Sequence, residues 1–212
     1  MEDATGMTQR QTEDTSKMPA GLADLVARAG KTRGTPPVER WNPPFCGDID
    51  MRIASDGRWY YMGSPIGREA LVRLFASVLR RDEDGRHYLV TPVERVGITV
   101  EDAPFIAVEM HAQGEGREQR LTLRTNVGDV VDADADHPLR FEREAGTDGL
   151  KPYIRVRGRL DALLARPLLY QLAELFEEQE VEGRAMLGVW SGGVFFAAVA
   201  ADETDTETGG AG

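Results

Sequence analysis

The chain of 212 residues has a single cysteine, few aromatic residues and no long apolar run. Because Cys46 stands alone, neither an intramolecular disulfide nor a cysteine-based zinc site can form. No apolar run approaches the roughly 20 residues that cross a bilayer. The acidic start Met1-Glu2-Asp3-Ala4 is the opposite of a secretory signal. We therefore expect a soluble, cytoplasmic protein.

Histidine is also scarce, and no element carries a basic stripe. His87, His111 and His137 are scattered without the spacing of a metal site, so we expect no metal and no cofactor. The formal net charge is -11, which disfavours binding along a nucleic-acid backbone. A small anionic ligand remains compatible with this charge, because it needs only a few local arginines.

The composition is otherwise typical of a globular protein, with 41% hydrophobic and 29% charged residues. Polar, acidic sequences at both ends predict disordered tails over residues 1–19 and 201–212. The chain between them is long enough for two small domains, which we place at residues 20–95 and 96–200.

Apolar periodicity predicts a mixture of strands and helices. Alternation over residues 48–53 and a return over 58–62 predict a hairpin. Helical spacing predicts a short helix ending at Gly30, a long helix over 65–81 and a second long helix from Pro167. Further strands are expected at 87–90, 93–100, 105–111, 120–124, 139–142, 153–157, 185–190 and 194–199. The pattern predicts an α+β fold with mostly antiparallel sheets and one long helix in each domain.

The two halves of the chain show a weak internal repeat. Residues 50–53 and 153–156 are similar strands, and each leads to an arginine beside a helix start, Arg68 or Arg166. The order strand, helix, strand recurs in both halves. This order predicts that the two domains are related by duplication.

The densest group of polar residues lies in and just after the N-terminal hairpin. Asp48 and Asp50 share one strand face with Arg52, which is typical of a pair that binds a cation or orients a polar ligand. The alternative is a solvated strand face with weak ion pairs. Gly67 and Arg68 stand at a helix entry that suits a phosphate or carboxylate, or they belong to ordinary capping.

Cationic and aromatic residues in both halves extend this candidate site. Arg155, Arg157 and Arg166 repeat the placement of an arginine near a helix start. Trp59 or Trp190 could stack on a planar ligand at the domain junction, or both are core residues.

Several blocks of sequence occur in a characteristic order: Gly47–Ile53, Gly63–Arg68, Leu89–Glu94, Val100–Phe105, Val156–Leu160 and Leu187–Gly192. Through these blocks the chain resembles the bacterial domain-of-unknown-function family numbered 1285 over about residues 20–200. The resemblance implies a duplicated α+β core with a C-terminal half like a pleckstrin-homology barrel. It also implies a nucleotide-type ligand at the domain interface and a role in signal transduction. It supplies no catalytic residues.

Together these patterns predict a non-enzymatic ligand-binding protein in signal transduction. Its ligand would be a small anionic, nucleotide-like molecule between the domains, oriented by the aspartates, bound by the arginines and stacked on a tryptophan. One alternative is a metal-dependent phosphate-ester hydrolase that uses Asp48 and Asp50. Another is a protein-interaction adaptor with a signalling partner. Neither a nucleic acid nor a membrane is an expected partner.

Overall fold

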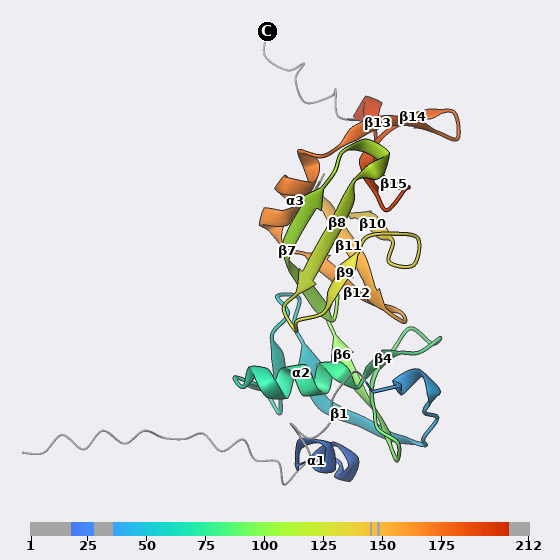
Figure 1. Ribbon diagram of the computed structural model, residues 1–212. Coiled ribbons are helices and arrows are strands. Elements are labelled where there is room, and N and C mark those ends of the chain that lie inside the picture. Colours follow the sequence, from blue (N-terminus) through green and yellow to red (C-terminus); the bar gives the residue numbers. More distant parts are fainter. Residues whose placement is uncertain (1–17, 28–35, 145, 148, 204–212) are drawn as a thin grey trace, which may run out of the picture.

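The computed structural model describes residues 18–27, 36–144, 146–147 and 149–203. Figure 1 shows two lobes stacked end to end, the N-terminal lobe in blue to green and the C-terminal lobe in yellow-green to red. None of the helices within those ranges has the length and hydropathy of a membrane span. Our predictions for residues 1–17, Gly30 and 204–212 lie outside the described residues.

The N-terminal lobe is built on a six-stranded sheet with the order β3-β2-β1-β6-β5-β4. Its central strands β1 and β6 are parallel, and the other neighbours are antiparallel. The strands are β1 (Phe45–Ile53), β2 (Trp59–Tyr61), β3 (Ser64–Pro65), β4 (Leu79–Arg81), β5 (His87–Val90) and β6 (Arg95–Val100). The helices are α1 (Ala20–Ala27), the 3-10 turn η2 (Val38–Arg40) and α2 (Glu69–Ser77).

The core of this lobe lies between the sheet and α2. Met51 and Ile53 alternate with polar residues along β1 and are buried, as the sequence predicts. Trp59 stacks on Phe75 of α2, with the ring centroids 6.4 Å apart. The helix is shorter than the predicted range 65–81. Its last predicted turn instead forms β4, because residues 79–81 pair with β5 in the sheet.

The C-terminal lobe contains a second six-stranded sheet with the order β10-β11-β12-β7-β8-β9. Its strands are β7 (Phe105–Gln113), β8 (Arg120–Thr125), β9 (Val130–Asp132), β10 (Leu139–Arg143), β11 (Leu150–Arg157) and β12 (Leu160–Leu164). After α3 (Arg166–Ala173), a three-stranded sheet follows, made of β13 (Glu177–Val181), β14 (Arg184–Ser191) and β15 (Val194–Ala200). The short turns are η3 (Gly116–Glu118) and η4 (Ala201–Glu203). The sequence patterns missed β9, β12 and β13.

The two large sheets share one strand order. Counted along the chain, each reads 3-2-1-6-5-4, and in each the first strand is parallel to the sixth. The helices differ, because α2 follows the third strand of its sheet whereas α3 follows the sixth. Residues 50–53 lie in a first strand and 153–156 in a fifth, so the repeat read from the sequence aligns strands at different positions. The fold is mixed α+β, mostly sheet.

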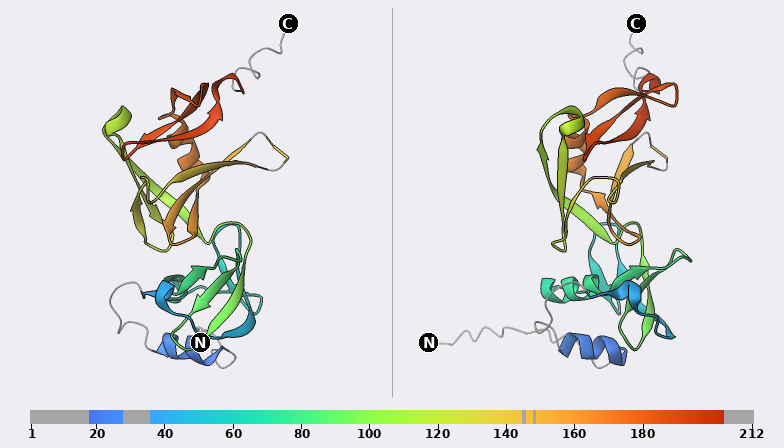
Figure 2. Two further views of the ribbon diagram at one scale, coloured as in Figure 1. Left: turned by 90° about the vertical axis from the view of Figure 1, so that its right-hand side faces the viewer. Right: turned by 45° about the vertical axis from the view of Figure 1, so that its right-hand side comes forward.

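Polar and apolar contacts join the two lobes. The chain passes from the first sheet to the second between Val100 and Phe105, shortly after the boundary that we placed at residues 95/96. Arg157 donates to the carbonyl oxygen of Ala76 at the end of α2, at 2.7 Å, and pairs with Asp129 in its own lobe. Buried apolar residues of both lobes form one contiguous cluster. Two further views separate the lobes clearly (Figure 2).

Candidate functional site

A hairpin of the N-terminal lobe, β4 and β5, projects toward the other lobe. Its turn is acidic and closes with a hydrogen bond from the amide of Gly85 to the carbonyl oxygen of Asp82, at 3.1 Å. Gly85 has φ of +79°, which glycine adopts without strain. Arg81 and His87 are cross-strand partners in this hairpin. Their side chains therefore point to the same face.

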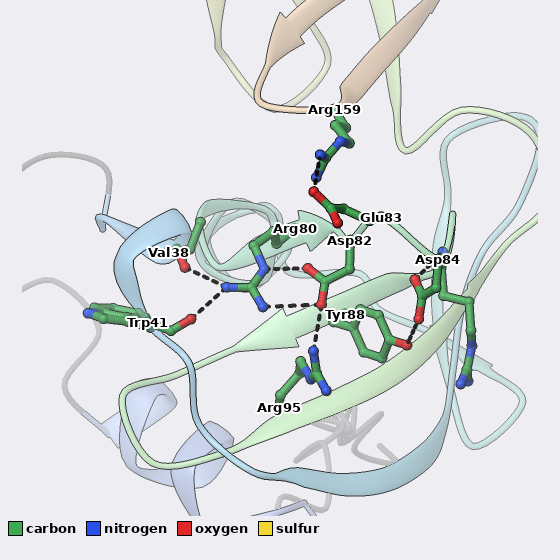
Figure 3. Close-up of polar contacts among 10 residues, drawn as sticks. Val38, Trp41, Arg80, Asp82, Glu83, Asp84, Tyr88, Arg95 and Arg159 are labelled. Atoms are coloured by element: carbon green, nitrogen blue, oxygen red, sulfur yellow. Dashed lines mark hydrogen bonds and ion pairs between the residues drawn. The ribbon is translucent and has the colours of Figure 1, made fainter.

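The buried guanidinium of Arg80 fixes the base of the hairpin (Figure 3). Its Nε donates to Asp82 at 2.6 Å, and its Nη1 donates to the carbonyl oxygens of Val38 at 2.8 Å and Trp41 at 2.7 Å. Arg95 donates to the second oxygen of Asp82 at 2.7 Å. Charge-assisted bonds of this kind are stronger than neutral ones. They make the hairpin a fixed platform.

The next two acidic residues of the turn face different partners. Asp84 accepts hydrogen bonds from the Tyr88 hydroxyl at 2.6 Å and the Arg86 amide at 2.9 Å, and these bonds lower its pKa, the tyrosine most. Glu83 reaches across to Arg159 of the C-terminal lobe, with Oε1 3.0 Å from Nη2 (Figure 3). The hairpin thus touches both lobes.

A cleft of about 310 Å³ lies between the lobes beside this hairpin. Its volume is at the lower end of the range for small-molecule sites. The residues that line it come from both lobes: Arg81, Gly85, His87, Val100, Asp102, Ala103, Pro104, Arg140, Glu142, Tyr153, Arg159 and Asp161.

A buried carboxylate organises the side of the cleft that the C-terminal lobe provides. Asp161, only 6% exposed, accepts hydrogen bonds from Arg155 and from Arg140, the latter at 3.1 Å. Arg140 also pairs with Glu142 and lies over the ring of Tyr153, 4.1 Å from its centroid. The two guanidinium groups compensate the buried charge of Asp161. Both cleft-lining groups, Arg140 and Asp161, are therefore held in place.

Asp102 in the connection between the sheets ties this connection to the C-terminal lobe. Its carboxylate accepts a hydrogen bond from the Tyr153 hydroxyl at 2.7 Å and pairs with Lys151. Burial and this hydrogen bond raise the pKa of Tyr153 well above its ordinary value. Tyr153 therefore stays a protonated donor at neutral pH.

Arg81 and His87 supply the polar groups of the cleft that are not fully used. Nε2 of His87 is buried without a hydrogen-bond partner among the described residues. Burial, and then the charge of Arg81, lower the pKa of His87 to about 4, so the ring is neutral at pH 7. Nε of Arg81 donates to the carbonyl oxygen of Gly85 at 3.1 Å, but within the described ranges Arg81 forms no ion pair with a carboxylate.

The aspartates predicted for a ligand lie elsewhere, on the exposed face of the first sheet. Asp48 pairs with Arg86, and Asp50 is exposed on the same strand face. Arg52 pairs with Glu101 and lies 4.3 Å from the centroid of the Tyr60 ring. Asp48 and Arg52 thus belong to separate surface ion pairs, and none of Asp48, Asp50 and Arg52 lines the cleft.

The predicted tryptophans do not line the cleft either. Trp59 is 1% exposed in the N-terminal core. Trp190 is 8% exposed, packs on Phe195 and lies beneath the guanidinium of Arg117. Both are core residues in this structure, which was the alternative interpretation of the sequence.

The remaining predicted residues are distributed over three places. Gly67 lines a small groove of about 90 Å³ at the start of α2, where Arg68 is exposed in the N-cap position. Arg155 holds Asp161 at the back of the cleft, and Arg157 joins the lobes. Arg166 lies at the start of α3 beside the Tyr170 hydroxyl, at 3.4 Å.

Sequence reasoning missed the residues that line the cleft. They come from six strands, two hairpin turns and the connection between the sheets, so no short motif contains them. One signal was present: Asp161 is an isolated acid inside the apolar strand β12. A charged residue in such a strand requires a partner, and arginines on β11 and β10 provide it.

Comparison with known proteins gives the chain a family. Residues 36–103 match the "Domain of unknown function (DUF1285), N-terminal domain", and residues 104–198 match the "Protein of unknown function (DUF1285), C-terminal domain". No curated protein matches the chain.

Two solved structures of the same family are similar. A protein from Silicibacter pomeroyi DSS-3 is 49% identical, with a TM-score of 0.78 over 87% of this chain and 97% of that one. Another from Shewanella baltica OS155 is 25% identical, with a TM-score of 0.48 over 61% of this chain and 94% of that one. With both family domains matched in order, the chain belongs to the DUF1285 family.

Proposed function

We propose that this protein binds a small anionic molecule in the cleft between its lobes. The observation that carries the proposal is the pair Arg81 and His87. Within the part of the chain that the structure describes, Arg81 has no carboxylate partner, and the buried ring nitrogen of His87 beside it has no hydrogen bond. An anion between them would accept hydrogen bonds from both groups. Such a bond would satisfy the buried polar atom, whose isolation costs free energy.

The charges around the cleft favour an anion over a cation. Arg140 and Arg155 are matched by Asp161 and Glu142, Arg159 by Glu83, and Lys151 by Asp102. Arg81 is left as the surplus charge. The ligand is therefore expected to carry a carboxylate or a phosphate.

A nucleotide-like ligand and a role in signalling are the finer parts of the proposal. The resemblance between the sheet orders supports a duplicated core, and a ligand at the junction of two related domains fits that architecture. The pleckstrin-homology likeness stays a prediction. Tyr153 is the aromatic ring beside which a base would sit, although Arg140 covers one of its faces. The proposal assigns no reaction to the cleft.

The test is calorimetric titration of the full chain with inorganic phosphate, simple dicarboxylates and nucleoside monophosphates. Arg81→Ala should weaken binding at least tenfold, about 1.4 kcal/mol. Arg73→Ala is the matched control, because Arg73 is an exposed arginine of α2 paired with Glu69. A nucleotide that binds no better than phosphate would remove the nucleotide-like part. Silence across the panel, or equal affinity in Arg81→Ala, would overturn the proposal and favour the protein-interaction adaptor.

A further inference from the structure

Helix α1 packs on the N-terminal lobe at the end far from the cleft, against α2 (Figures 1 and 2). It lies outside the residues that match the family domains. Leu22 is fully buried, and Leu25 and Val26 pack against the same apolar cluster. The lobe thus offers α1 a groove with an apolar floor.

A buried carboxylate in this groove receives the beginning of α1. Glu94, 8% exposed, accepts a hydrogen bond from the backbone amide of Leu22 at 2.8 Å, across 72 positions of sequence. The first amides of a helix have no partner inside the helix, and the helix dipole favours a negative charge there. Among the described residues no other group donates a hydrogen bond to the Glu94 carboxylate. Glu94 therefore recognises a helix N-terminus instead of a particular side chain.

The groove also selects the residue before the buried leucine. A Cβ atom on Gly21 would lie 2.7 Å from Oγ1 of Thr91 and 2.8 Å from the Glu94 carboxyl carbon. Thr91 cannot move freely, because its Oγ1 accepts a hydrogen bond from the Glu94 amide at 3.2 Å. Only glycine fits at this point. The groove therefore accepts the pattern Gly-Leu-x-x-Leu-Val at the beginning of a helix, as in residues 21–26.

The helix in the groove is short. Eight residues are too few for a stable isolated helix, so α1 is expected to form only while it is docked. Its docking depends on the buried side chains of Met18 and Leu22, a few partly buried apolar residues and one hydrogen bond to Glu94. A helix held by so few contacts can be exchanged for another with the same pattern.

We propose that the groove between α2 and the turn 91–94 is a helix-binding site that α1 fills when the chain is alone. Its partner is a protein with an amphipathic helix that begins Gly-Leu-x-x-Leu and displaces α1. The glycine, the leucines and the free N-terminal amides are the features by which the groove recognises this helix. The site is separate from the cleft, and it does not depend on the function proposed there.

The test uses the full chain, labelled with ¹⁵N, and a peptide of residues 18–27 with blocked ends. Leu22→Asp should release α1 and leave the groove open, and Gly21→Val should do the same by a different route. Added peptide should then shift the amide signals of Thr91 to Glu94 in both variants. In the wild-type chain it should bind at least tenfold more weakly, because tethered α1 competes at an effective concentration of about millimolar.

Two controls examine the recognition itself. A peptide carrying Gly21→Val should not bind either variant. Adding Glu94→Gln to the Leu22→Asp chain should weaken the peptide severalfold, since the amide loses a charged acceptor. Circular dichroism and the signals of α2 report that each variant remains folded.

Three results would overturn the proposal. The first is no shift at millimolar peptide in both folded variants. The second is equal binding by the wild-type chain, which would mean that α1 does not fill the groove. The third is a concentration-dependent dimer of the wild-type chain that Leu22→Asp abolishes. That dimer would assign the groove to α1 of a second copy and not to a different partner.

Discussion

Lowering the pH from 7.5 to 5.0 should destabilise the protein through His87 in particular. The pKa of His87 is lowered to about 4 in the fold, by burial and then by Arg81, from 6.5 in an unconstrained chain. Between these values the unfolded chain binds a proton that the folded chain does not. The stability that neutral His87 contributes is therefore complete above pH 6.5 and is lost as the pH falls toward 4.

The two pKa values set the size of the effect. Applied in full, the difference between them lowers the free energy of unfolding by about 2 kcal/mol at pH 5.0 relative to pH 7.5. The ring is only partly buried, so solvent screens the interaction with Arg81. We therefore expect a loss of about 1 kcal/mol at pH 5.0.

Urea unfolding followed by tryptophan fluorescence measures this loss. Carboxylates titrate in every variant, so the informative quantity is the difference between the wild-type chain and His87→Gln. The wild type should lose about 1 kcal/mol more than His87→Gln on going to pH 5.0. His111→Gln, at an exposed position on β7, is the control and should behave like the wild type. Equal losses in His87→Gln and the wild type, with an NMR titration of His87 centred near pH 6.5, would refute the reasoning.

Four substitutions test other parts of the structure. Arg80→Ala should lower the free energy of unfolding, measured with urea, by about 3 to 5 kcal/mol. The substitution leaves the partly buried Asp82 with one cation fewer and two backbone carbonyls without their donor. A decrease below about 1 kcal/mol would contradict this role of Arg80. Gly188→Ala should cost about 1 to 3 kcal/mol, since its Cβ would lie 2.3 Å from the carbonyl oxygen of Phe196. Gly97→Ala should lower the free energy of unfolding by less than Gly188→Ala does. The new Cβ would lie 2.0 Å from Oδ1 of Asp48, which is the end of a side chain that can move away. A larger decrease for Gly97→Ala than for Gly188→Ala would contradict this reasoning. Arg157→Ala should increase amide hydrogen exchange in the last turn of α2, because the Arg157 guanidinium donates a hydrogen bond to a carbonyl oxygen there in the wild type. Unchanged exchange would show that this hydrogen bond does not hold the lobes together.

Much of the secondary structure could be predicted because local patterns determine it. The hairpin of β1 and β2 follows from alternation and a turn, and the pair β14 and β15 follows in the same way. The end of α2 could not be predicted, since residues 79–81 have an apolar helical pattern but pair with β5. Strand β13 has the sequence Glu-Glu-Gln-Glu-Val, and its edge position beside β14 makes it a strand. Tertiary pairing decided both cases.

The candidate site was less predictable than the fold. Local reasoning favoured Asp48, Asp50 and Arg68, because they stand close together in sequence near a helix start. The cleft combines Arg81 and His87 with Arg140 and Asp161, which lie more than fifty positions further along the chain. Only the packing of the two sheets brings these residues together. His87 in particular gave no signal, since a single histidine in a strand resembles any half-buried side chain.

The strand order of the two large sheets has a consequence for how the chain folds during synthesis. Each sheet is joined at its centre by its first and last strands, β1 with β6 and β7 with β12. The first sheet therefore cannot close until residue 100 has left the ribosome, nor the second until residue 164. Contacts between such distant segments slow folding, and until they form, the three-stranded halves expose open edges. We expect the nascent chain to depend on chaperone protection mainly in these two intervals, each of which ends when a central parallel pair forms.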